Sequence, residues 1–350
     1  PIIIEAKTFR VRGHEEASGI KYVPPKLIEK WKKKDPIYLF EKKLIKDKLI
    51  NQKEIDSIYT DINDKINKGI EDAFNSSFPV SSKKQELKDV YAIKSYKPIN
   101  PNEESHELRY VDAIKESLYQ SMKRDDKIIL MGQDIAEYGG VFKITEGFVD
   151  DFGKERVRNT PIIESGVIGA ALGLSIEGFK PIVEMQFADF ISCGINQVIN
   201  NLAKTHYRWG QPVNVTLRMP TGGGVSAGPF HSQNLESLFM HIPGLKIVYP
   251  SCPYDAKGLL ASSINDPNPI LFFEHKLLYR TQKTNVPKKE YTLEIGKGRI
   301  IQKGEDLTVV TYGLSTIWLK EILEELKEQN ISIELIDLRS LMPWDKSLVY

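Results

Sequence analysis

The sequence has few cysteines and few histidines, and this scarcity excludes several kinds of site. Its two cysteines, Cys193 and Cys252, lie far apart, and neither belongs to a C-x-x-C pair. A disulfide framework and a cysteine zinc site are therefore excluded, and a reducing compartment is favoured. The six histidines form no H-E-x-x-H motif and no pair at helical spacing, so a zinc site of the metalloprotease type is excluded too.

Long apolar runs and an excess of one charge are also lacking. The longest apolar run, residues 165–176, has about a dozen residues, whereas a helix needs ~20 to cross a bilayer, and no secretory signal opens the chain. The 48 basic and 47 acidic residues leave a net charge of +1, so no overall field attracts nucleic acid or an anionic membrane. The lysine-rich stretch 26–48 has the pattern of a solvated helix face. We expect no nucleic acid and no membrane among the partners.

The length favours more than one domain, because single hydrophobic cores rarely grow past ~250–300 residues and the chain has 350. Between residues 76 and 108 the hydrophobic period gives way to serines, prolines and charged clusters, which predicts a linker. We therefore expect a helical tail at 1–75, that linker, an α/β domain at 109–285 and the start of another at 286–350. The chain begins in a strand-like Ile-Ile-Ile run and stops within a pattern, so we expect a piece of a longer polypeptide.

The first segment combines an extended start with helices. Residues 2–4 and 8–11 predict the last strand of a domain, and the pattern turns helical from Pro25. Asn51 and Glu54 have the spacing of a capping box, in which each side chain bonds to the backbone N–H of the other residue. An apolar stripe at three- and four-residue steps follows, made of Ile55, Ile58, Ile62, Ile66, Ile70 and Phe74.

Strands and helices alternate beyond the linker. A helix at 111–122 and a strand at 128–131 are followed by continuous apolar runs, which indicate parallel strands buried on both faces. The predicted fold class is α/β: a parallel sheet covered by helices, followed by the start of a second α/β unit. The other predicted strands are 181–185, 213–218, 246–249, 270–274, 307–312 and 332–335, and the other predicted helices are 165–177, 190–206, 232–241, 254–265 and 318–329.

Ligands of an open parallel sheet bind at the carboxyl ends of its strands, where three loops carry unusual residues. Glu164 stands just before the apolar run 165–176, where weak solvation would let its carboxyl group share a proton with a ligand. The alternative is that Glu164 caps the helix N-terminus and interacts with the helix dipole. Spacing alone leaves both interpretations open.

The other two loops carry an aromatic and amide cluster and a histidine. The run Gln186 to Phe190 is suited to wall a planar ring, or it is core packing with Asp189 as a helix cap. The glycine-rich loop 221–228 is not a P-loop, because no G-K-[ST] follows it. His231 stands at the start of a predicted helix, where it could exchange protons, although a single histidine is more often structural.

Taken in this order, these elements resemble the β half of the thiamine-diphosphate-dependent decarboxylating component of 2-oxo acid dehydrogenase complexes. Residues 109–350 carry that resemblance, and residues 1–75 resemble the end of the α half, which indicates a fused α–β chain. The resemblance implies a transketolase-like pyrimidine-binding domain followed by the start of a transketolase C-terminal-like domain. The matching motifs are Thr8-Phe-Arg-Val-Arg-Gly-His14, Asp35-Pro-Ile, Gly132-Gln-Asp-Ile, Gly139-Gly-Val-Phe142, Asn159-Thr-Pro-Ile, Gln186-Phe-Ala-Asp-Phe190, His231-Ser-Gln and Pro243-Gly-Leu-Lys-Ile-Val-Tyr-Pro250.

Within this family, the Gln186 motif and the Gly222-Gly-Gly-Val run are more similar to enzymes acting on branched-chain 2-oxo acids of the 2-oxoisovalerate type. Two features differ from the family pattern. Glu15 stands where the α-half loop usually carries a phosphorylatable serine, so kinase control there is not expected. The Gly-Asp-Gly…Asn motif that holds magnesium and the diphosphate is missing, and we expect it upstream of Pro1.

The resemblance also implies roles for single residues. Glu164 would hydrogen-bond a pyrimidine nitrogen of thiamine diphosphate and so help remove the proton from its thiazolium carbon. Phe190 would stack on the pyrimidine, and Ile162 and Gln186 would line the same region. His231 would transfer protons during decarboxylation or acyl transfer to lipoamide.

Further implications concern the α half, ions and partners. His14 would lie beside the diphosphate and assist acyl transfer, and Asp266 and Asn268 would mark a structural potassium site. The expected partner is the lipoyl-bearing dihydrolipoamide acyltransferase component, with fused chains assembled as an α2β2-like homo-oligomer. The expected location is the bacterial cytoplasm or an organelle matrix. Two alternatives stay open: a catalytically silent β-type scaffold that docks the acyltransferase core, and a transketolase-like enzyme acting on sugar phosphates.

Overall fold

A computed structural model describes residues 2–15, 17, 19–93 and 97–350. The chain divides into two compact units, Pro1–Ser81 and Ser82–Tyr350, which are described separately. Within the described ranges, no helix has both the length and the apolar character needed to cross a membrane.

The first unit contains three helices, α1 (Pro25–Lys32), α2 (Pro36–Lys46) and α3 (Gln52–Asn75). The predicted capping box begins α3: Asn51 Oδ1 accepts from the Glu54 backbone N–H at 3.0 Å, and Glu54 Oε2 accepts from the Asn51 N–H at 2.8 Å. The strands predicted at residues 2–4 and 8–11 are wrong, since those residues adopt no regular structure. A strand needs a neighbour for its N–H and C=O groups, and the described part of this unit contains none.

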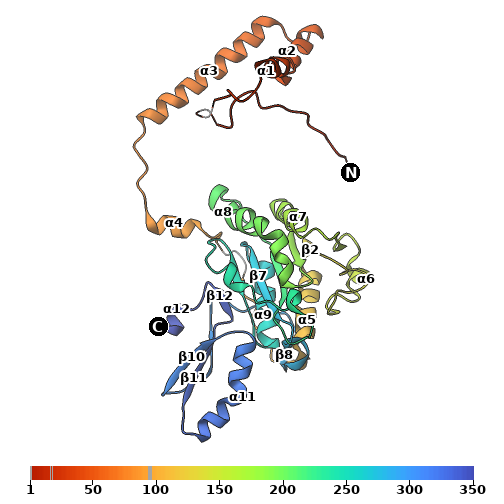
Figure 1. The fold of residues 1–350 in the computed structure, drawn as a ribbon, viewed down its shortest axis with the longest axis vertical. Coiled ribbons are helices and arrows are strands. Elements are labelled where there is room, and N and C mark those ends of the chain that lie inside the picture. Colours follow the sequence, from red (N-terminus) through yellow and green to blue (C-terminus); the bar gives the residue numbers. More distant parts are fainter. Residues whose placement is uncertain (1, 16, 18, 94–96) are drawn as a thin grey trace. The chain divides into compact units, whose positions relative to one another are not determined.

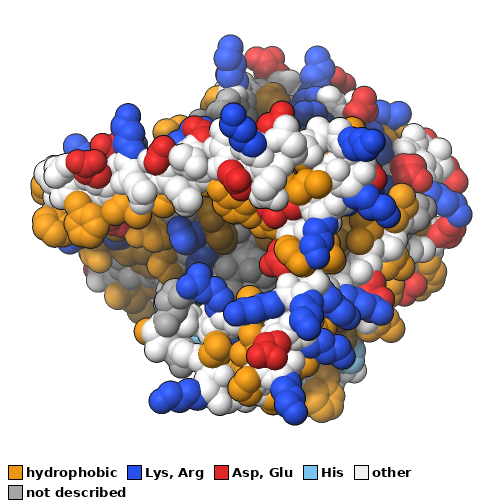
Figure 2. Space-filling view, turned by 90° about the horizontal axis from the view of Figure 1, so that it is seen from above, with side chains coloured by type: hydrophobic (Ala, Val, Ile, Leu, Met, Phe, Trp, Pro, Cys, Tyr) orange, Lys and Arg blue, Asp and Glu red, His pale blue; other side chains and the backbone are white. Residues whose placement is uncertain are grey.

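The apolar stripe of α3 is largely exposed. Only its first member, Ile55, is buried, whereas the side chains from Ile58 to Phe74 along the stripe are about half exposed or more. Figure 2 shows hydrophobic side chains at the surface of the molecule, among lysine, arginine, aspartate and glutamate side chains. The first unit therefore leaves one face of its longest helix uncovered.

Part of the predicted linker is ordered and belongs to the second unit. Helix α4 (Lys83–Asp89) contacts it through Glu86, whose carboxylate accepts from the Tyr207 hydroxyl at 2.5 Å. Beyond α4, the Tyr91 hydroxyl donates to the Leu245 carbonyl at 3.0 Å. These partners lie more than a hundred residues away in sequence, which local periodicity cannot indicate.

The second unit is built on a seven-stranded sheet with the order β12-β6-β7-β5-β4-β2-β3 (Figure 1). All neighbours are parallel except β12 and β6, so the expected parallel sheet is confirmed. The strands are β2 (Ile128–Gly132), β3 (Val157–Asn159), β4 (Lys180–Glu184), β5 (Thr216–Thr221), β6 (Lys246–Val248), β7 (Ile270–His275) and β12 (Ser340–Met342).

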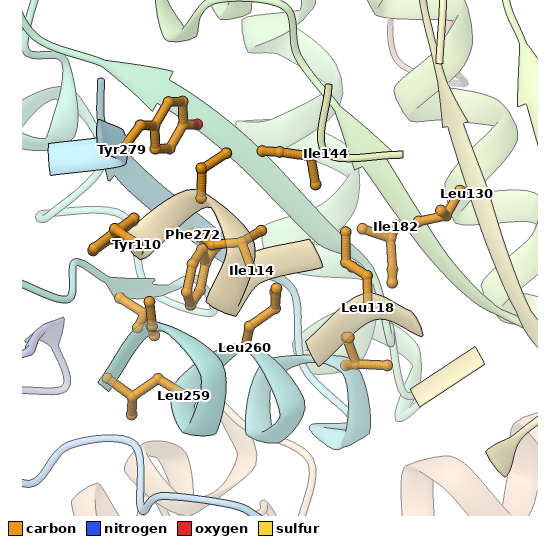
Figure 3. Close-up of a cluster of buried hydrophobic side chains, with 14 of the residues drawn as sticks. Tyr110, Ile114, Leu118, Leu130, Ile144, Ile182, Leu259, Leu260, Phe272 and Tyr279 are labelled. Atoms are coloured by element: carbon orange, nitrogen blue, oxygen red, sulfur yellow. The ribbon is translucent and has the colours of Figure 1, made fainter. Parts of the chain in front are cut away.

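Helices cover both faces of this sheet. Leu130 and Ile182 belong to one buried cluster with α5 (Tyr110–Arg124) and α9 (Pro253–Asn265), which Figure 3 shows. The next residue on each strand, Met131 and Val183, belongs to the opposite cluster with α7 (Glu164–Ile176). Successive side chains of a strand point to opposite faces, so both faces are cores. This explains why the strands are continuous apolar runs.

Smaller elements complete the unit. The predicted strand–helix–strand near the C-terminus is confirmed as β10 (Leu307–Thr311), α11 (Leu314–Glu328) and β11 (Ile333–Asp337), with β9 (Arg299–Gln302) antiparallel to β11. An antiparallel pair, β1 (Ser105–Arg109) and β8 (Lys283–Pro287), was not predicted. The remaining short helices are α6 (Phe148–Phe152), α10 (Leu278–Thr281) and α12 (Lys346–Val349).

Two predicted helices and one predicted strand differ from the structure. The strand expected at 213–218 is shifted to β5 (Thr216–Thr221). The helix expected at 190–206 is divided into a 3₁₀ segment (Ala188–Gly194), a π segment (Gln197–Leu202) and α8 (Ala203–Trp209). The helix expected at 232–241 is wrong: short 3₁₀ turns, Pro229–His231 and Glu236–Leu238, flank and interrupt an irregular segment.

Candidate active site

The carboxyl edge of the sheet brings together the ends of β2, β3 and β4. A narrow cavity of about 10 Å³ lies there, with room for about one water molecule. Glu164 and Gln186 both line it, so the structure brings these two predicted site residues together. The full lining is Gly132, Gln133, Thr160, Glu164, Val167, Val183, Glu184, Met185 and Gln186.

Glu164 is the first residue of α7 and is half-buried. Its Oε1 accepts from Gln133 Nε2 at 3.3 Å. The residue at the N-cap is Ile163, and no side chain caps the helix, so Glu164 is not a capping residue. Ile162, predicted to line the same region, is 83% exposed and stands outside the cavity wall.

Phe190 and His231 meet in an aromatic cluster with Phe187, which directly follows Gln186 in the chain. Their ring centroids lie 5.5 Å apart, and Phe187 contacts both rings edge-on, at 5.8 Å from Phe190 and 4.6 Å from His231. His231 is half-buried and ends a three-residue 3₁₀ turn rather than heading a helix. The second and third predicted loops are therefore in direct contact.

Asp189, which the sequence offered as a helix cap, and Gln233 hold these loops together. Asp189 is 5% exposed, and its Oδ1 accepts from both the backbone N–H and the side-chain amide of Gln233, at 3.1 and 3.0 Å. The Gln233 carbonyl in turn accepts from the Gly222 N–H and the Thr221 hydroxyl, at 3.1 and 2.9 Å. Asp189 thus links two loops instead of capping a helix, and the backbone groups around His231 are used by these bonds rather than by a helix.

A buried lysine fixes the glycine-rich loop from the other side. Lys276 is 3% exposed, and its Nζ donates to the Gly222 carbonyl at 2.5 Å. Burial lowers the pKa of Lys276 to about 8, and Asp189 opposes this shift only in part. Gly222 has a φ of +81°, and a Cβ there would stand 2.1 Å from His275 Nε2, so only glycine fits this position.

A buried charge cluster spans β4, β5 and β7 beneath the cavity. Arg218 is fully buried; it donates two bonds of 2.7 Å to Glu274 and a third to Glu184. The Tyr279 hydroxyl also donates to Glu274, at 2.7 Å. Burial raises the pKa of Glu184 against the attraction of Arg218. Because Glu184 also lines the cavity, a second carboxyl group stands close to Glu164.

The remaining predicted residues have other surroundings. Both oxygens of Asp266 accept from the Lys246 ammonium, at 2.9 and 2.7 Å, and the Asn268 side chain bonds to the backbone of Ala92. A potassium ion at Asp266 would have to compete with that ammonium, and the site stays a prediction. His14 belongs to the first unit, where its Nδ1 lies 3.4 Å from a guanidinium nitrogen of Arg10.

No metal cluster accompanies these residues. Throughout residues 2–15, 17, 19–93 and 97–350, no group of three or more His, Cys, Asp or Glu side chains is arranged to hold a metal ion. The described residues therefore do not fit a magnesium ion.

Comparisons with known proteins cover nearly the whole chain. Residues 106–282 match the family described as "Transketolase, pyrimidine binding domain", residues 296–350 match "Transketolase, C-terminal domain", and residues 1–82 match "Dehydrogenase E1 component". A solved structure described as "Split gene transketolase, inactive beta4 tetramer" is similar in fold, with a TM-score of 0.57, 21% identity and coverage of 69% of this chain and 75% of that one.

Curated relatives agree with these family matches. The 2-oxoisovalerate dehydrogenase subunit beta of Bacillus subtilis is 45% identical over 246 residues, 69% of this chain and 75% of the relative. The pyruvate dehydrogenase E1 component subunit beta of Staphylococcus epidermidis is 42% identical over 241 residues, 68% of this chain and 74% of the relative. The chain therefore belongs to the family of E1 components of 2-oxo acid dehydrogenases, and it joins an E1 dehydrogenase segment and a β-subunit segment in one polypeptide.

Proposed function

We propose that this chain acts in the thiamine-diphosphate-dependent oxidative decarboxylation of a 2-oxo acid. The substrate loses carbon dioxide, and its 2-oxo carbon becomes the acyl carbon of a thioester, while a lipoyl disulfide is reduced to that thioester and a thiol. The observation that carries the proposal is the position of Glu164, in a cavity at the carboxyl edge of the sheet beside Gln186.

The described residues supply groups whose chemistry suits the edge of the pyrimidine ring of thiamine diphosphate. In the described part of the chain, Gln133 alone donates to the Glu164 carboxyl group, so its Oε2 is left for a ring nitrogen. Phe190 would pack against the ring, with Gln186 and Ile162 beside it. When bound, thiamine diphosphate supplies a carbon nucleophile and an electron sink. Glu164 would hold and return a proton at the ring nitrogen.

The roles of the histidines follow from their surroundings. His231 is held between Phe187 and Phe190, and the Asp189 bonds to Gln233 fix the chain two residues after it. A half-buried imidazole in a fixed position is suited to deliver a proton at the reacting carbon. His14 would assist from the α half, beside the diphosphate. No role is assigned through magnesium, because the described residues do not fit it.

Exposed apolar side chains at this edge of the sheet support the proposal that another protein surface covers it. Ile162 is 83% exposed, Ile163 53% and Phe230 75%. Large apolar groups beside a site commonly mark an interface. We infer that fused chains associate as an α2β2-like homo-oligomer and that the assembly receives the lipoyl group of a dihydrolipoamide acyltransferase.

The proposal that the substrate is a branched-chain 2-oxo acid rests on the two motifs near Gln186 and Gly222. The relatives named for 2-oxoisovalerate and for pyruvate are similarly identical to this chain, so overall identity does not choose between them. The test compares decarboxylation of 3-methyl-2-oxobutanoate and of pyruvate by the full polypeptide. A higher kcat/KM for pyruvate would reject the branched-chain assignment while leaving the reaction class intact.

The reaction class is tested at Glu164. Glu164→Gln should keep the fold and slow proton–deuterium exchange at the thiazolium carbon by at least about 100-fold. Glu177→Gln, at the exposed opposite end of α7, is the matched control. Exchange at the wild-type rate in Glu164→Gln would reject this role. If calorimetry detects no binding of thiamine diphosphate to the full polypeptide, the silent scaffold is favoured instead. Activity only on sugar phosphates would favour the transketolase-like alternative.

A further inference from the structure

We propose that Lys276 is a positioning residue for His231: its ammonium holds closed the loop of residues 222–233 that carries this histidine. This role rests on the proposed function, because it gives a cause for the fixed position from which His231 would deliver a proton. Lys276 is buried and directly follows β7, and no step of the proposed reaction uses its side chain. What supports the role is the way in which the two ends of the loop are bound.

The loop is closed where its two ends meet. The Gly222 N–H donates to the Gln233 carbonyl at 3.1 Å, and we call this pair the neck of the loop. Between the two ends, residues 224–230 are exposed, and residues 223–227 form no backbone hydrogen bond within the described ranges. The position of His231, two residues before Gln233, therefore depends on the neck.

Lys276 binds the neck from the sheet. Its backbone N–H donates to the Thr221 carbonyl at 3.0 Å, next to the last pair of residues that joins β5 to β7, so the sheet fixes its backbone. Its Nζ donates to the Gly222 carbonyl at 2.5 Å. At the other end of the loop, Asp189 accepts from Gln233 at 3.1 and 3.0 Å. A buried cation thus holds one end of the loop, and a buried anion holds the other.

The stability of the sheet does not require the Lys276 ammonium. The residue is 3% exposed, and among the residues that the structure describes no ion pair joins its Nζ to a carboxylate. A buried charge without a close partner of opposite sign lowers the stability of the fold. An apolar side chain of similar length, such as methionine, would fill the space without that cost. The contribution of the charge is therefore its bond to the Gly222 carbonyl.

A second contact links Lys276 to His231. The Lys276 Nζ lies 5.5 Å from the centroid of the Phe187 ring, and this ring meets the His231 ring edge-on at 4.6 Å. Aromatic rings attract ammonium groups, so the charge also favours the observed position of Phe187. His231 is therefore held both through the backbone of the neck and through the Phe187 ring.

Amide hydrogen exchange of the full polypeptide tests the neck with neither cofactor nor substrate. In Lys276→Met, we expect the amides of Gly222 and Gln233 to exchange about tenfold faster than in the wild type, because a lost hydrogen bond shifts the local opening equilibrium. The β5 amide of Leu217 should exchange at the wild-type rate, and urea unfolding at pH 7.5 should show no loss of stability. Lys303→Met, with an exposed side chain, is the matched control.

Kinetics test the link between Lys276 and His231. Lys276→Met should lower kcat for lipoamide acylation by about tenfold and leave KM within about twofold of the wild type. Because Lys276 acts through His231, adding Lys276→Met to His231→Asn should cause no further loss. A merely structural role would instead give additive losses.

The outcomes separate this role from the proposed function. Wild-type exchange at the neck, equally faster exchange at Leu217, a wild-type kcat in Lys276→Met, or additive losses in the double variant would each overturn the proposal. A wild-type polypeptide that acylates no lipoamide would reject the proposed function and with it the role for His231, whereas the exchange rates would still decide whether Lys276 closes the loop.

Discussion

Asp189 and Gln233, forty-four residues apart in sequence, are joined by two hydrogen bonds to a single carboxylate oxygen. This pair connects the loop that carries Phe190 to the segment that carries His231. The second oxygen of Asp189 is buried and has no partner in the described part of the chain. The carboxylate fixes Gln233, two residues after His231, so we assign Asp189 a positioning role and not a catalytic one.

Asp189→Asn should weaken the hydrogen bonds from Gln233 while keeping the shape of the side chain. An amide oxygen accepts more weakly than a carboxylate, and a hydrogen bond to a charged group contributes ~1.5–3 kcal/mol. We expect the free energy of unfolding to fall by about 1–2 kcal/mol and kcat for lipoamide acylation to fall by about tenfold, with little change in KM. Asp150→Asn, at an exposed position, is the matched control. Equal loss of kcat in both variants would contradict the positioning role.

His231 itself should matter for proton transfer and not for cofactor affinity. His231→Asn keeps a polar side chain beside Phe187 and Phe190 but removes the imidazole that would accept and donate the proton. We expect lipoamide acylation to slow by about 100-fold, with the affinity for thiamine diphosphate within about twofold of the wild type. His241→Asn, exposed in the same segment, is the control. Unchanged acylation in His231→Asn would remove this residue from the mechanism.

The buried Lys276 should make stability depend on alkaline pH in a defined direction. Its pKa is about 8 in the folded chain, against an ordinary value of 10.5. Between these values the unfolded chain binds a proton that the folded chain has released, so stability rises with pH. Below pH 8 the cost of burying the ammonium is fully present.

The measurement is urea unfolding of the wild type and Lys276→Met at pH 7.5, 9 and 10.5. The stability of the wild type relative to Lys276→Met should increase across this range by on the order of 2 kcal/mol. Lys303→Met, with an exposed side chain, should show no such trend. A difference that stays flat from pH 7.5 to 10.5 would show that Lys276 does not titrate there.

The cluster of Arg218 with Glu184 and Glu274 predicts a large stability loss from one substitution. Arg218→Met leaves two carboxylates buried without a cation, and breaking a buried pair in this way costs about 3–5 kcal/mol. Arg208→Met, at an exposed position on α8, should cost less than about 1 kcal/mol. Urea unfolding at pH 7 measures both. A similar loss in the two variants would mean that the cluster contributes little.

The sequence predicted those elements whose signals are local. The helix α5 and the strand β2 follow from hydrophobic period and run length, and the capping box at Asn51 follows from a three-residue spacing. The pair β1 and β8 could not be predicted, because each strand is stabilised by a partner about 180 residues away. The same reason explains the missing helix after His231, where bonds to Asp189 and Gly222 replace helical ones.

The candidate site likewise contains residues that a local signal identifies and residues that only the fold reveals. Four site residues are predicted from the general rule that ligands of a parallel sheet bind at the ends of its strands: Glu164, Gln186, Phe190 and His231. In the structure Glu164 begins α7, and Phe190 and His231 lie in 3₁₀ segments. Lys276 carried no such signal, because a lysine following a strand is usually solvated, and only the fold shows that it is buried.

The last prediction concerns the start of the second unit, from α4 to Ala92. The Asn268 side chain accepts from the Ala92 N–H at 2.7 Å and donates to the Ala92 carbonyl at 3.0 Å, so it replaces a strand partner for that residue. Asn268→Ala leaves both backbone groups without these bonds and should loosen α4, which carries trypsin sites at Lys83, Lys84 and Lys88. We expect trypsin to cleave there about tenfold faster in Asn268→Ala than in the wild type, because a lost pair of hydrogen bonds shifts the local opening equilibrium by ~1–2 kcal/mol. Asn285→Ala, exposed on β8, should be cleaved at the wild-type rate, and equal rates in all three proteins would show that Asn268 does not anchor this segment.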